Sequence, residues 1–160
     1  MIKLVRVDYR LVHGQVAISW TRAIGADCIL VANDDVAKDE MRQSMIRMSK
    51  PQGVKLVIKS IEDSIKAINS GVTDKYNLLV VVNCLKDAER LTSGCSQIKE
   101  INLGVMPAHD GTTAISKAIN VTKDDVECMK RLLKNDVKLN IQQVPTEVST
   151  IVNEKMLNIS

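Results

Sequence analysis

The sequence predicts an α/β fold, an open and mostly parallel twisted sheet with helices on both faces. Short apolar runs alternate with segments of helical period along the chain, as they do when parallel strands are linked by crossover helices. Several runs are almost continuously apolar, which is typical of strands covered on both faces. A chain of 160 residues is the usual size of one domain with one core, so we expect a single domain over residues 1–160.

The predicted elements follow one another in a regular order. Strands are expected at residues 2–7, 28–32, 54–58, 78–83, 100–104 and 137–143. Helices are expected at residues 14–24, 35–48, 61–70, 86–93 and 123–134. Three side chains fit as N-terminal caps of helices, Asp34, Ser60 and Thr122, and "TKDD" is typical of a capping box. Segment 107–121 predicts a loop that leads into a short strand, and segment 147–159 predicts a final helix.

The composition narrows the classes of function. Its 22 basic and 19 acidic residues give a net charge of +3 without a basic block, and two Tyr, one Trp and no Phe offer little for base stacking. We therefore expect no nucleic-acid partner. No stretch resembles a signal peptide or a membrane span, which favours a cytoplasmic protein. Without any CxxC pair, the cysteines are expected to be free thiols, not disulfides or zinc ligands: Cys28, Cys84, Cys95 and Cys128.

The stretch "RVDYRLVHGQVAISW", residues 6–20, combines the end of the first predicted strand with the start of the first helix. Ligands of open parallel sheets bind beyond the carboxyl ends of the strands. A helix that begins near Gly14 presents unpaired N–H groups and a partial positive charge there, just after His13. The turn between strand and helix is therefore suited to a negatively charged group.

The other polar residues of this turn fit an anion as well. Arg10 offers a planar fork for phosphate oxygens, Arg6 can approach from the end of the strand, and Asp8 can orient either arginine or one histidine nitrogen. Among such groups His13 can act as a nucleophile. The alternative is that His13 only caps the helix while the arginines pair with Asp8 or Asp27 as a solvated rim, and spacing alone leaves both readings open.

The same stretch resembles the amino-terminal signature of a known family. "RVDYRLVHGQVAISW" is similar to that of the IIB components of the mannose/fructose/sorbose family of the phosphoenolpyruvate-dependent sugar phosphotransferase system. The resemblance continues through "ILVANDDVAKDEMRQSM", "INLG" at 101–104 and "VTKDDVECMKRLLKNDVKLNIQQVP", and so covers residues 1–146. It implies a mostly parallel sheet with one antiparallel strand and helices on both sides.

The resemblance also implies an activity, that of a phosphotransferase. His13 would accept a phosphoryl group from a IIA component and pass it to a sugar bound by the membrane components IIC and IID. The turn and the signature together give the expected phosphate-binding and supporting residues: Arg6, Asp8, Arg10, Gly14 and Gln15. No metal and no cofactor is expected, and without a P-loop ATP is not the expected donor. The identity of the sugar stays open, and homo-oligomers are compatible with the sequence.

The sequence leaves two other functions open. The turn between the first strand and the first helix could hold a phosphorylated metabolite without covalent chemistry. It could also serve a regulatory protein that uses the charge state of the histidine.

In the loop 104–111, His109 is interpreted as a solvated histidine, the alternatives being an approach to the site or a metal site with Asp110. Three methionines at helical spacing indicate core or interface packing: Met41, Met45 and Met48.

Overall fold

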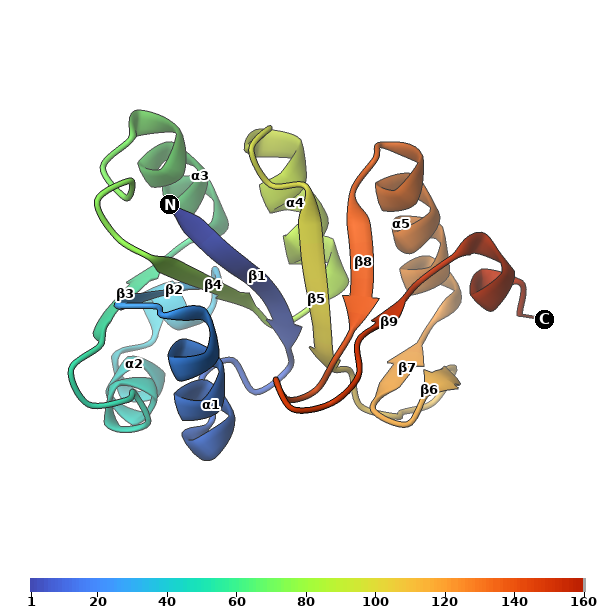
Figure 1. Cartoon of the computed structure of the whole chain (residues 1–160), viewed down its shortest axis with the longest axis horizontal. Coiled ribbons are helices and arrows are strands. Elements are labelled where there is room, and N and C mark those ends of the chain that lie inside the picture. Colours follow the sequence, from blue (N-terminus) through green and yellow to red (C-terminus); the bar gives the residue numbers. More distant parts are fainter. Residues whose placement is uncertain (160) are drawn as a thin grey trace.

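A computed structural model describes residues 1–159 of the chain (Figure 1). Its strands are β1 (Ile2–Asp8), β2 (Cys28–Ala32), β3 (Lys55–Lys59), β4 (Leu78–Val82), β5 (Glu100–Val105), β6 (Thr113–Ser116), β7 (Ile119–Val121), β8 (Lys138–Ile141) and β9 (Thr150–Ile151). The α-helices are α1 (Gly14–Ile24), α2 (Glu40–Met48), α3 (Ile61–Ser70), α4 (Leu85–Gly94) and α5 (Lys123–Lys134). Two 3-10 turns are η1 (Val36–Lys38) and η2 (Glu154–Leu157).

The main sheet confirms the predicted class. Its strand order is β3-β2-β4-β1-β5-β8-β9, and every neighbouring pair is parallel except β8 and β9. A separate hairpin of β6 and β7 lies beside the carboxyl end of the sheet (Figure 1). The fold is thus an open, mostly parallel sheet with one antiparallel strand, as expected.

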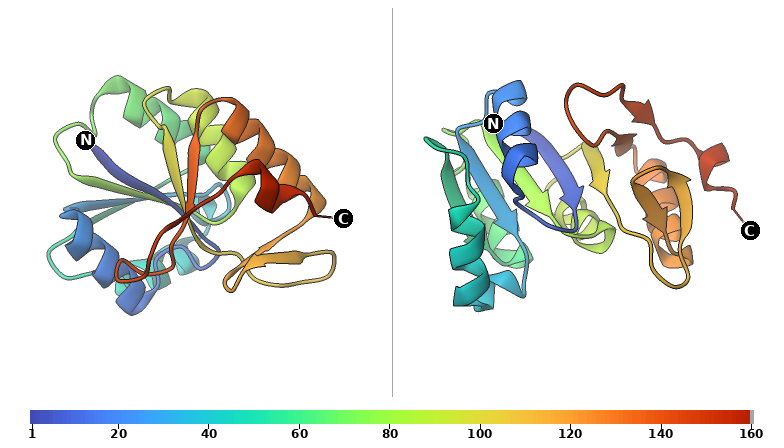
Figure 2. Two further views of the ribbon diagram at one scale, coloured as in Figure 1. Left: turned by 45° about the vertical axis from the view of Figure 1, so that its right-hand side comes forward. Right: turned by 90° about the horizontal axis from the view of Figure 1, so that it is seen from below.

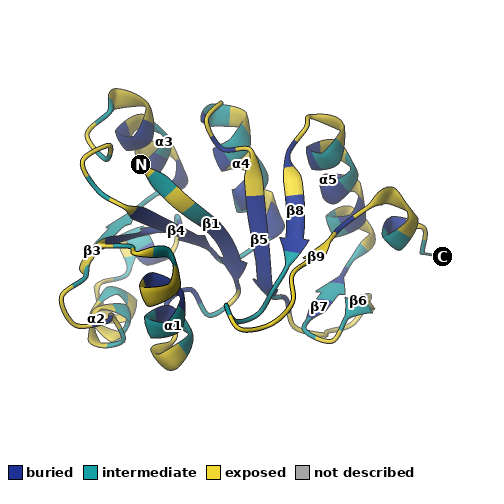
Figure 3. Cartoon of the chain, viewed as in Figure 1, coloured by how far each residue is buried: buried dark blue, intermediate teal, exposed yellow. Residues whose placement is uncertain are grey.

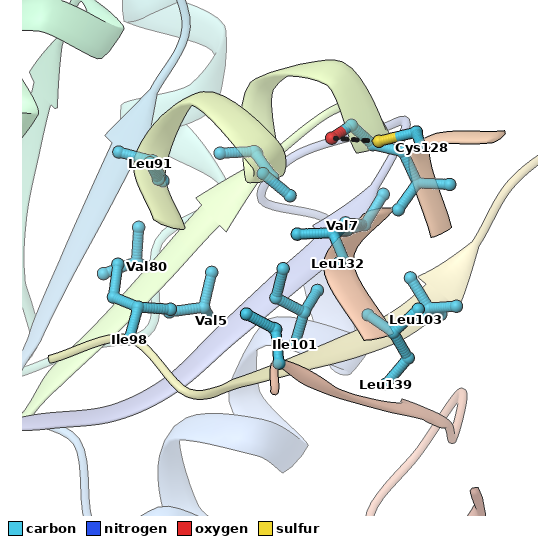
Figure 4. Packing of buried hydrophobic residues seen from close by; sticks show 14 of the residues in the cluster. Val5, Val7, Val80, Leu91, Ile98, Ile101, Leu103, Cys128, Leu132 and Leu139 are labelled. Atoms are coloured by element: carbon cyan, nitrogen blue, oxygen red, sulfur yellow. Dashed lines mark hydrogen bonds between the residues drawn. The ribbon is translucent and has the colours of Figure 1, made fainter. Parts of the chain in front are cut away.

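Two hydrophobic clusters pack on the two faces of the sheet. Along β2, Cys28, Leu30 and Ala32 face the larger cluster with α3, α4 and α5, while Ile29 and Val31 face the smaller one with α1, because successive side chains of a strand point to opposite faces. Figure 2 shows the two helical layers, Figure 3 the buried strands between exposed outer helix surfaces, and Figure 4 part of the larger cluster. The smaller cluster consists of Leu11, Val12, Ala17, Trp20, Ile29, Val31, Val36, Leu56, Leu79 and Val81.

The topology creates a ligand-binding position next to β1. This strand lies between β4 and β5. The connection after β1 enters α1, which packs on the smaller cluster, whereas the connection after β4 enters α4, which packs on the larger one. Adjacent strands whose connections leave toward opposite faces open a crevice at their carboxyl ends, where open α/β sheets bind ligands.

The second predicted helix, 35–48, is divided in the structure. It consists of η1 and α2, and Asp39 caps α2 by accepting a hydrogen bond of 3.1 Å from the amide of Arg42. Asp34, predicted as the cap, instead accepts a bond from the amide of Ile61 and pairs with Arg90. It therefore caps α3 together with Ser60, which was predicted correctly.

Helix α2 is attached more loosely than the other helices of residues 1–159, because it contains no buried residue. Ile46 packs against the smaller cluster, Gln43 donates to the carbonyl of Val36, and Arg47 donates to that of Leu56. The outer face of this helix exposes Met41, Met45 and Met48. Of the two packing roles predicted for these methionines, the core role is therefore wrong.

The carboxyl half differs from prediction in two places. Segment 107–121 forms the β6–β7 hairpin instead of a loop with a single strand. The final helix predicted at 147–159 is wrong, since this segment forms β9 and the short turn η2, with Val152 and Leu157 buried in the larger cluster. The predicted capping box of α5 is confirmed, with Thr122 and Asp125 exchanging bonds of 3.0 and 2.9 Å.

Candidate functional site

The turn between β1 and α1 is fixed by hydrogen bonds around Asp8. The carbonyl of Asp8 accepts a bond of 2.9 Å from the amide of Leu11, and its Oδ1 accepts one of 3.0 Å from the amide of Arg10. Leu11 adopts a left-handed conformation with a φ of 62°, and its side chain is buried together with that of Val12 in the smaller cluster. These apolar anchors leave the next residue, His13, exposed at the start of α1.

Asp8 holds both arginines of the turn. Its carboxylate is 1% exposed and accepts bonds from Nη2 of Arg6 at 3.2 Å, Nε of Arg10 at 3.0 Å and Nη2 of Arg10 at 3.1 Å. Sequence reasoning proposed that Asp8 orients an arginine, and it orients two. The alternative, in which the arginines and their aspartate partners lie in solvent, is wrong for Arg6 and Asp8 because both residues are buried. The other aspartate of that alternative, Asp27, accepts a hydrogen bond from the amide of Asn77.

The guanidinium of Arg6 forms more hydrogen bonds within the protein than the sequence predicted. Its Nη1 donates to Oδ1 of Asn102 at 2.7 Å and to the carbonyl of Gln142 at 3.1 Å, and its Nη2 donates to the carbonyl of Gln143 at 3.0 Å. We call residues Gln142–Gln143 the strap. The indole of Trp20 donates to the same strap carbonyl, that of Gln143, and lies 5.3 Å from the Arg6 guanidinium. Arg6 therefore supports the turn from behind and does not approach a ligand from the end of the strand.

The two arginines on this carboxylate differ in electrostatic environment. Burial lowers the pKa of the Arg6 guanidinium, although the charge and hydrogen bond of Asp8 oppose this effect. The hydrogen bond to Asp8 raises the pKa of Arg10, which is partly exposed. Among residues 1–159, Nη1 of Arg10 has no hydrogen-bond partner, so this edge of its fork is available to a ligand.

His13 occupies the N-cap position of α1 without capping it through its side chain. Its carbonyl accepts bonds from the amides of Val16 and Ala17, so the backbone starts the helix while the imidazole stays in solvent. Within the described residues, the amides of Gly14 and Gln15 have no backbone acceptor, and Gly14 takes a φ of 41° that favours glycine. The reading in which the histidine side chain merely caps the helix is therefore wrong.

A hollow of about 270 Å³ lies directly against His13. The turn contributes one wall and α2 the other, and its lining residues are Arg10, Leu11, Val12, His13, Arg42, Met45, Ile46 and Ser49. Sequence reasoning did not find Arg42, because nothing in its own segment indicates that α2 lies across from the turn.

Three other site residues were also missed: Gly104, Asn102 and Gln142. They lie in "INLG" and "NIQQVP", segments that supported the family resemblance but received no role. A Cβ at Gly104 would fall within 3.0 Å of the Arg6 guanidinium, so glycine makes room for the buried cation. A signal was available in principle, since a buried arginine on a central strand requires polar partners on its neighbours.

His109 does not line the hollow next to His13. It lies in the exposed β5–β6 connection, where Nδ1 is 3.0 Å from the carbonyl oxygen of Asp110.

In the part of the chain that the structure describes, no three His, Cys, Asp or Glu side chains gather as a metal site requires. The four cysteines are free thiols, and Cys28, Cys95 and Cys128 are buried as predicted, whereas Cys84 is only half-buried. No helix in residues 1–159 is both long and apolar enough to cross a membrane.

The fold and this site define an open α/β protein that presents a histidine and an arginine at a helix N-terminus beside its topological switch point. Comparison with known proteins gives the same result. A family model described as the sorbose subfamily IIB component of the phosphotransferase system (PTS) matches residues 2–159. The chain therefore belongs to the sorbose-subfamily IIB components of the sugar phosphotransferase system, which confirms the resemblance of its amino-terminal signature.

Individual relatives agree with this assignment. A probable phosphotransferase enzyme IIB component of Streptococcus pyogenes is 40% identical over 117 residues, which are 73% of this chain and 72% of that protein. The mannose-specific EIIAB component of Escherichia coli is 31% identical over 92% of this chain, which spans only 46% of that longer protein. The crystal structure of the IIBSor domain of the Klebsiella pneumoniae sorbose permease superposes with a TM-score of 0.92 at 28% identity, covering 100% of this chain and 98% of that domain.

Proposed function

We propose that His13 is the phosphoryl carrier of this component, accepting the group from a IIA protein and passing it to a sugar bound by the membrane components IIC and IID. The observation that carries the proposal is the exposed His13 imidazole, which has no capping hydrogen bond and stands beside Arg10 and the unpaired amides of Gly14 and Gln15. A cytoplasmic location at the membrane component belongs to the same proposal.

The transfer balances without a metal or cofactor. A ring nitrogen of His13 attacks phosphorus with its lone pair, a new N–P bond forms, and the N–P bond of the donor histidine breaks with its electrons returning to the donor ring. In the second step a sugar hydroxyl attacks, the N–P bond of His13 breaks, and the imidazole can take up the hydroxyl proton. Protein groups need only align the reactants and disperse charge in such a step.

The site is suited to holding a phosphoryl group without trapping it. The unpaired amides at the start of α1 can donate to the phosphoryl group, and a helix N-terminus stabilises an exposed anion by only about 0.3–1 kcal/mol. Asp8 neutralises one of the two positive charges of Arg6 and Arg10. The remaining attraction therefore favours the phosphorylated state modestly, as a reversible relay requires.

The IIA donor is supported by the organisation of one relative. The Escherichia coli protein is named an EIIAB component, and this chain matches 46% of its length. We infer that the remainder of such a fused protein supplies the IIA function that this component requires. The relatives are named for different sugars, sorbose and mannose, so the sugar is left outside the proposal.

The test is covalent labelling. The purified chain is incubated with phosphoenolpyruvate, enzyme I, HPr and a IIA protein, and its intact mass is measured. We expect one added phosphoryl group that is lost in acid and stable in alkali, absent from His13→Ala and retained in the matched control His109→Ala. Labelling that persists in the His13 variant would refute the assignment, and a wild-type chain that binds inorganic phosphate but takes no label would favour non-covalent binding.

A further inference from the structure

The two arginines predicted to bind phosphate leave the site short of free positive charge. Arg6 is enclosed, and its guanidinium bonds to Asp8, Asn102 and the strap carbonyls. Arg10 uses Nε and Nη2 on Asp8. A dianionic phosphoryl group on His13 would thus find one free edge of Arg10 and the helix amides, and little else on this wall of the hollow.

Arg42 belongs to the part of the lining that α2 contributes. It lines the same hollow as His13 and Arg10, and its side chain is exposed. Within residues 1–159 its guanidinium forms no hydrogen bond or ion pair, although its backbone amide donates to Asp39. By contrast, Arg90 and Arg131 pair with carboxylates elsewhere on the surface.

The position of Arg42 in its helix argues against a role in helix stability. It follows the N-cap Asp39 by three residues and therefore lies in the first turn of α2. A cation in the first turn is disfavoured by the partial positive charge of the helix N-terminus. An anion bound in the hollow would remove this conflict, because it attracts the arginine and the helix end together.

We propose that Arg42 is the second cation of the phosphoryl site and contacts the phosphoryl oxygens on phosphorylated His13 from across the hollow. The inference rests on the proposed function and adds a residue to it. Arg10 and Arg42 then approach the group from the turn and from α2, so that the charge is dispersed over two guanidinium groups during transfer. Met45 and Ile46 form the apolar part of the same wall.

The test compares Arg42→Gln and Arg42→Lys with a matched control, Arg22→Gln. Arg22 is exposed in the last turn of α1, at the opposite end of the helix from His13. Quench-flow measurement of phosphoryl transfer from phosphorylated IIA should show a loss of about tenfold or more for Arg42→Gln, a smaller loss for Arg42→Lys, which keeps the charge but not the fork, and no change for the control.

A second measurement separates contact with phosphate from contact with the donor protein. The 31P resonance of the phosphorylated chain is titrated with pH in the absence of IIA. If Arg42 contacts the group, Arg42→Gln raises the second phosphoryl pKa, because a nearby cation favours the dianion, whereas Arg22→Gln leaves it unchanged. Weaker binding of IIA with an unchanged titration, or wild-type transfer by Arg42→Gln, would overturn the proposal. Either result leaves the labelling of His13 intact, so failure here is distinct from failure of the proposed function.

Discussion

Replacing Gly104 by alanine tests whether the buried Arg6 guanidinium holds the site together. A Cβ at this position on β5 would lie within 3.0 Å of Cζ and both terminal nitrogens of Arg6. The guanidinium cannot move aside without lengthening its bonds to Asp8, Asn102 and the strap carbonyls. The methyl group therefore has to displace either a hydrogen-bonded charge or the backbone of two central strands.

The loss of stability in G104A can be estimated from the contacts that the new methyl group disrupts. Overpacking a core costs about 1–3 kcal/mol, and a hydrogen bond to a charged group contributes about 1.5–3 kcal/mol. If one bond is lost along with moderate strain, G104A lowers the free energy of unfolding by about 3 kcal/mol. With a urea m-value of about 2 kcal/mol per M, the unfolding midpoint falls by about 1.5 M.

Urea unfolding followed by Trp20 fluorescence measures this shift, since Trp20 is the only tryptophan in the sequence. The matched control is Gly94→Ala, where the new Cβ would meet Cδ1, Cγ2 and Cγ1 of Ile65 at 2.7, 2.9 and 3.0 Å. These atoms belong to an apolar side chain, so this variant causes overpacking without the loss of a hydrogen bond to a charged group, and we expect a smaller shift. A midpoint for G104A within about 0.5 M of wild type would refute the view that Arg6 is fixed in place.

Three further predictions follow from the site and the core. Arg10→Lys keeps the charge but cannot span both oxygens of Asp8, so phosphoryl transfer should slow by about tenfold with an unchanged circular dichroism spectrum, and an unaltered rate would contradict a role for the fork. Binding to IIA should be weak, should weaken further along a salt series and should be lost in Arg10→Glu, whereas tight, salt-independent binding in titration calorimetry would argue against docking at this turn. Burial and Glu89 raise the pKa of Cys128 to about 12, so at pH 8 only about one molecule in 10⁴ carries the thiolate and iodoacetamide should spare this residue in the folded protein. Peptide mass spectrometry checks the last point, with Cys84, the half-buried thiol, as the internal comparison.

Secondary structure could be predicted well where periodicity and caps agreed. Helices 14–24, 61–70 and 123–134 match the structure residue for residue, because each has an apolar stripe, and the side chains of Ser60 and Thr122 cap the last two. The carboxyl-terminal helix failed for a physical reason. Val148 and Ile151 are three residues apart, which imitates a helical face, yet both are exposed while the backbone of Ile151 pairs with β8.

Only those site residues that are close in sequence could be predicted to lie together. His13, Arg10 and Asp8 lie within six residues of one another, so their proximity could be inferred from the sequence alone. The partners of Arg6 could not be identified from the sequence alone. Asn102 and the strap come from β5 and the segment after β8, and only the strand order brings them beside β1. Arg42 required the packing of α2 on the smaller cluster, which no spacing reveals.

The loose attachment of α2 has a consequence for motion. A helix without buried residues opens at a lower free energy than helices anchored in a core, so its amide protons should exchange with deuterium sooner than those of α1 or α5. Arg42 and Met45 belong to this helix and line one wall of the hollow, whereas His13 and Arg10 belong to a turn anchored by Leu11. We expect the mouth of the hollow to adapt to two differently shaped partners in succession while the reacting histidine keeps its place.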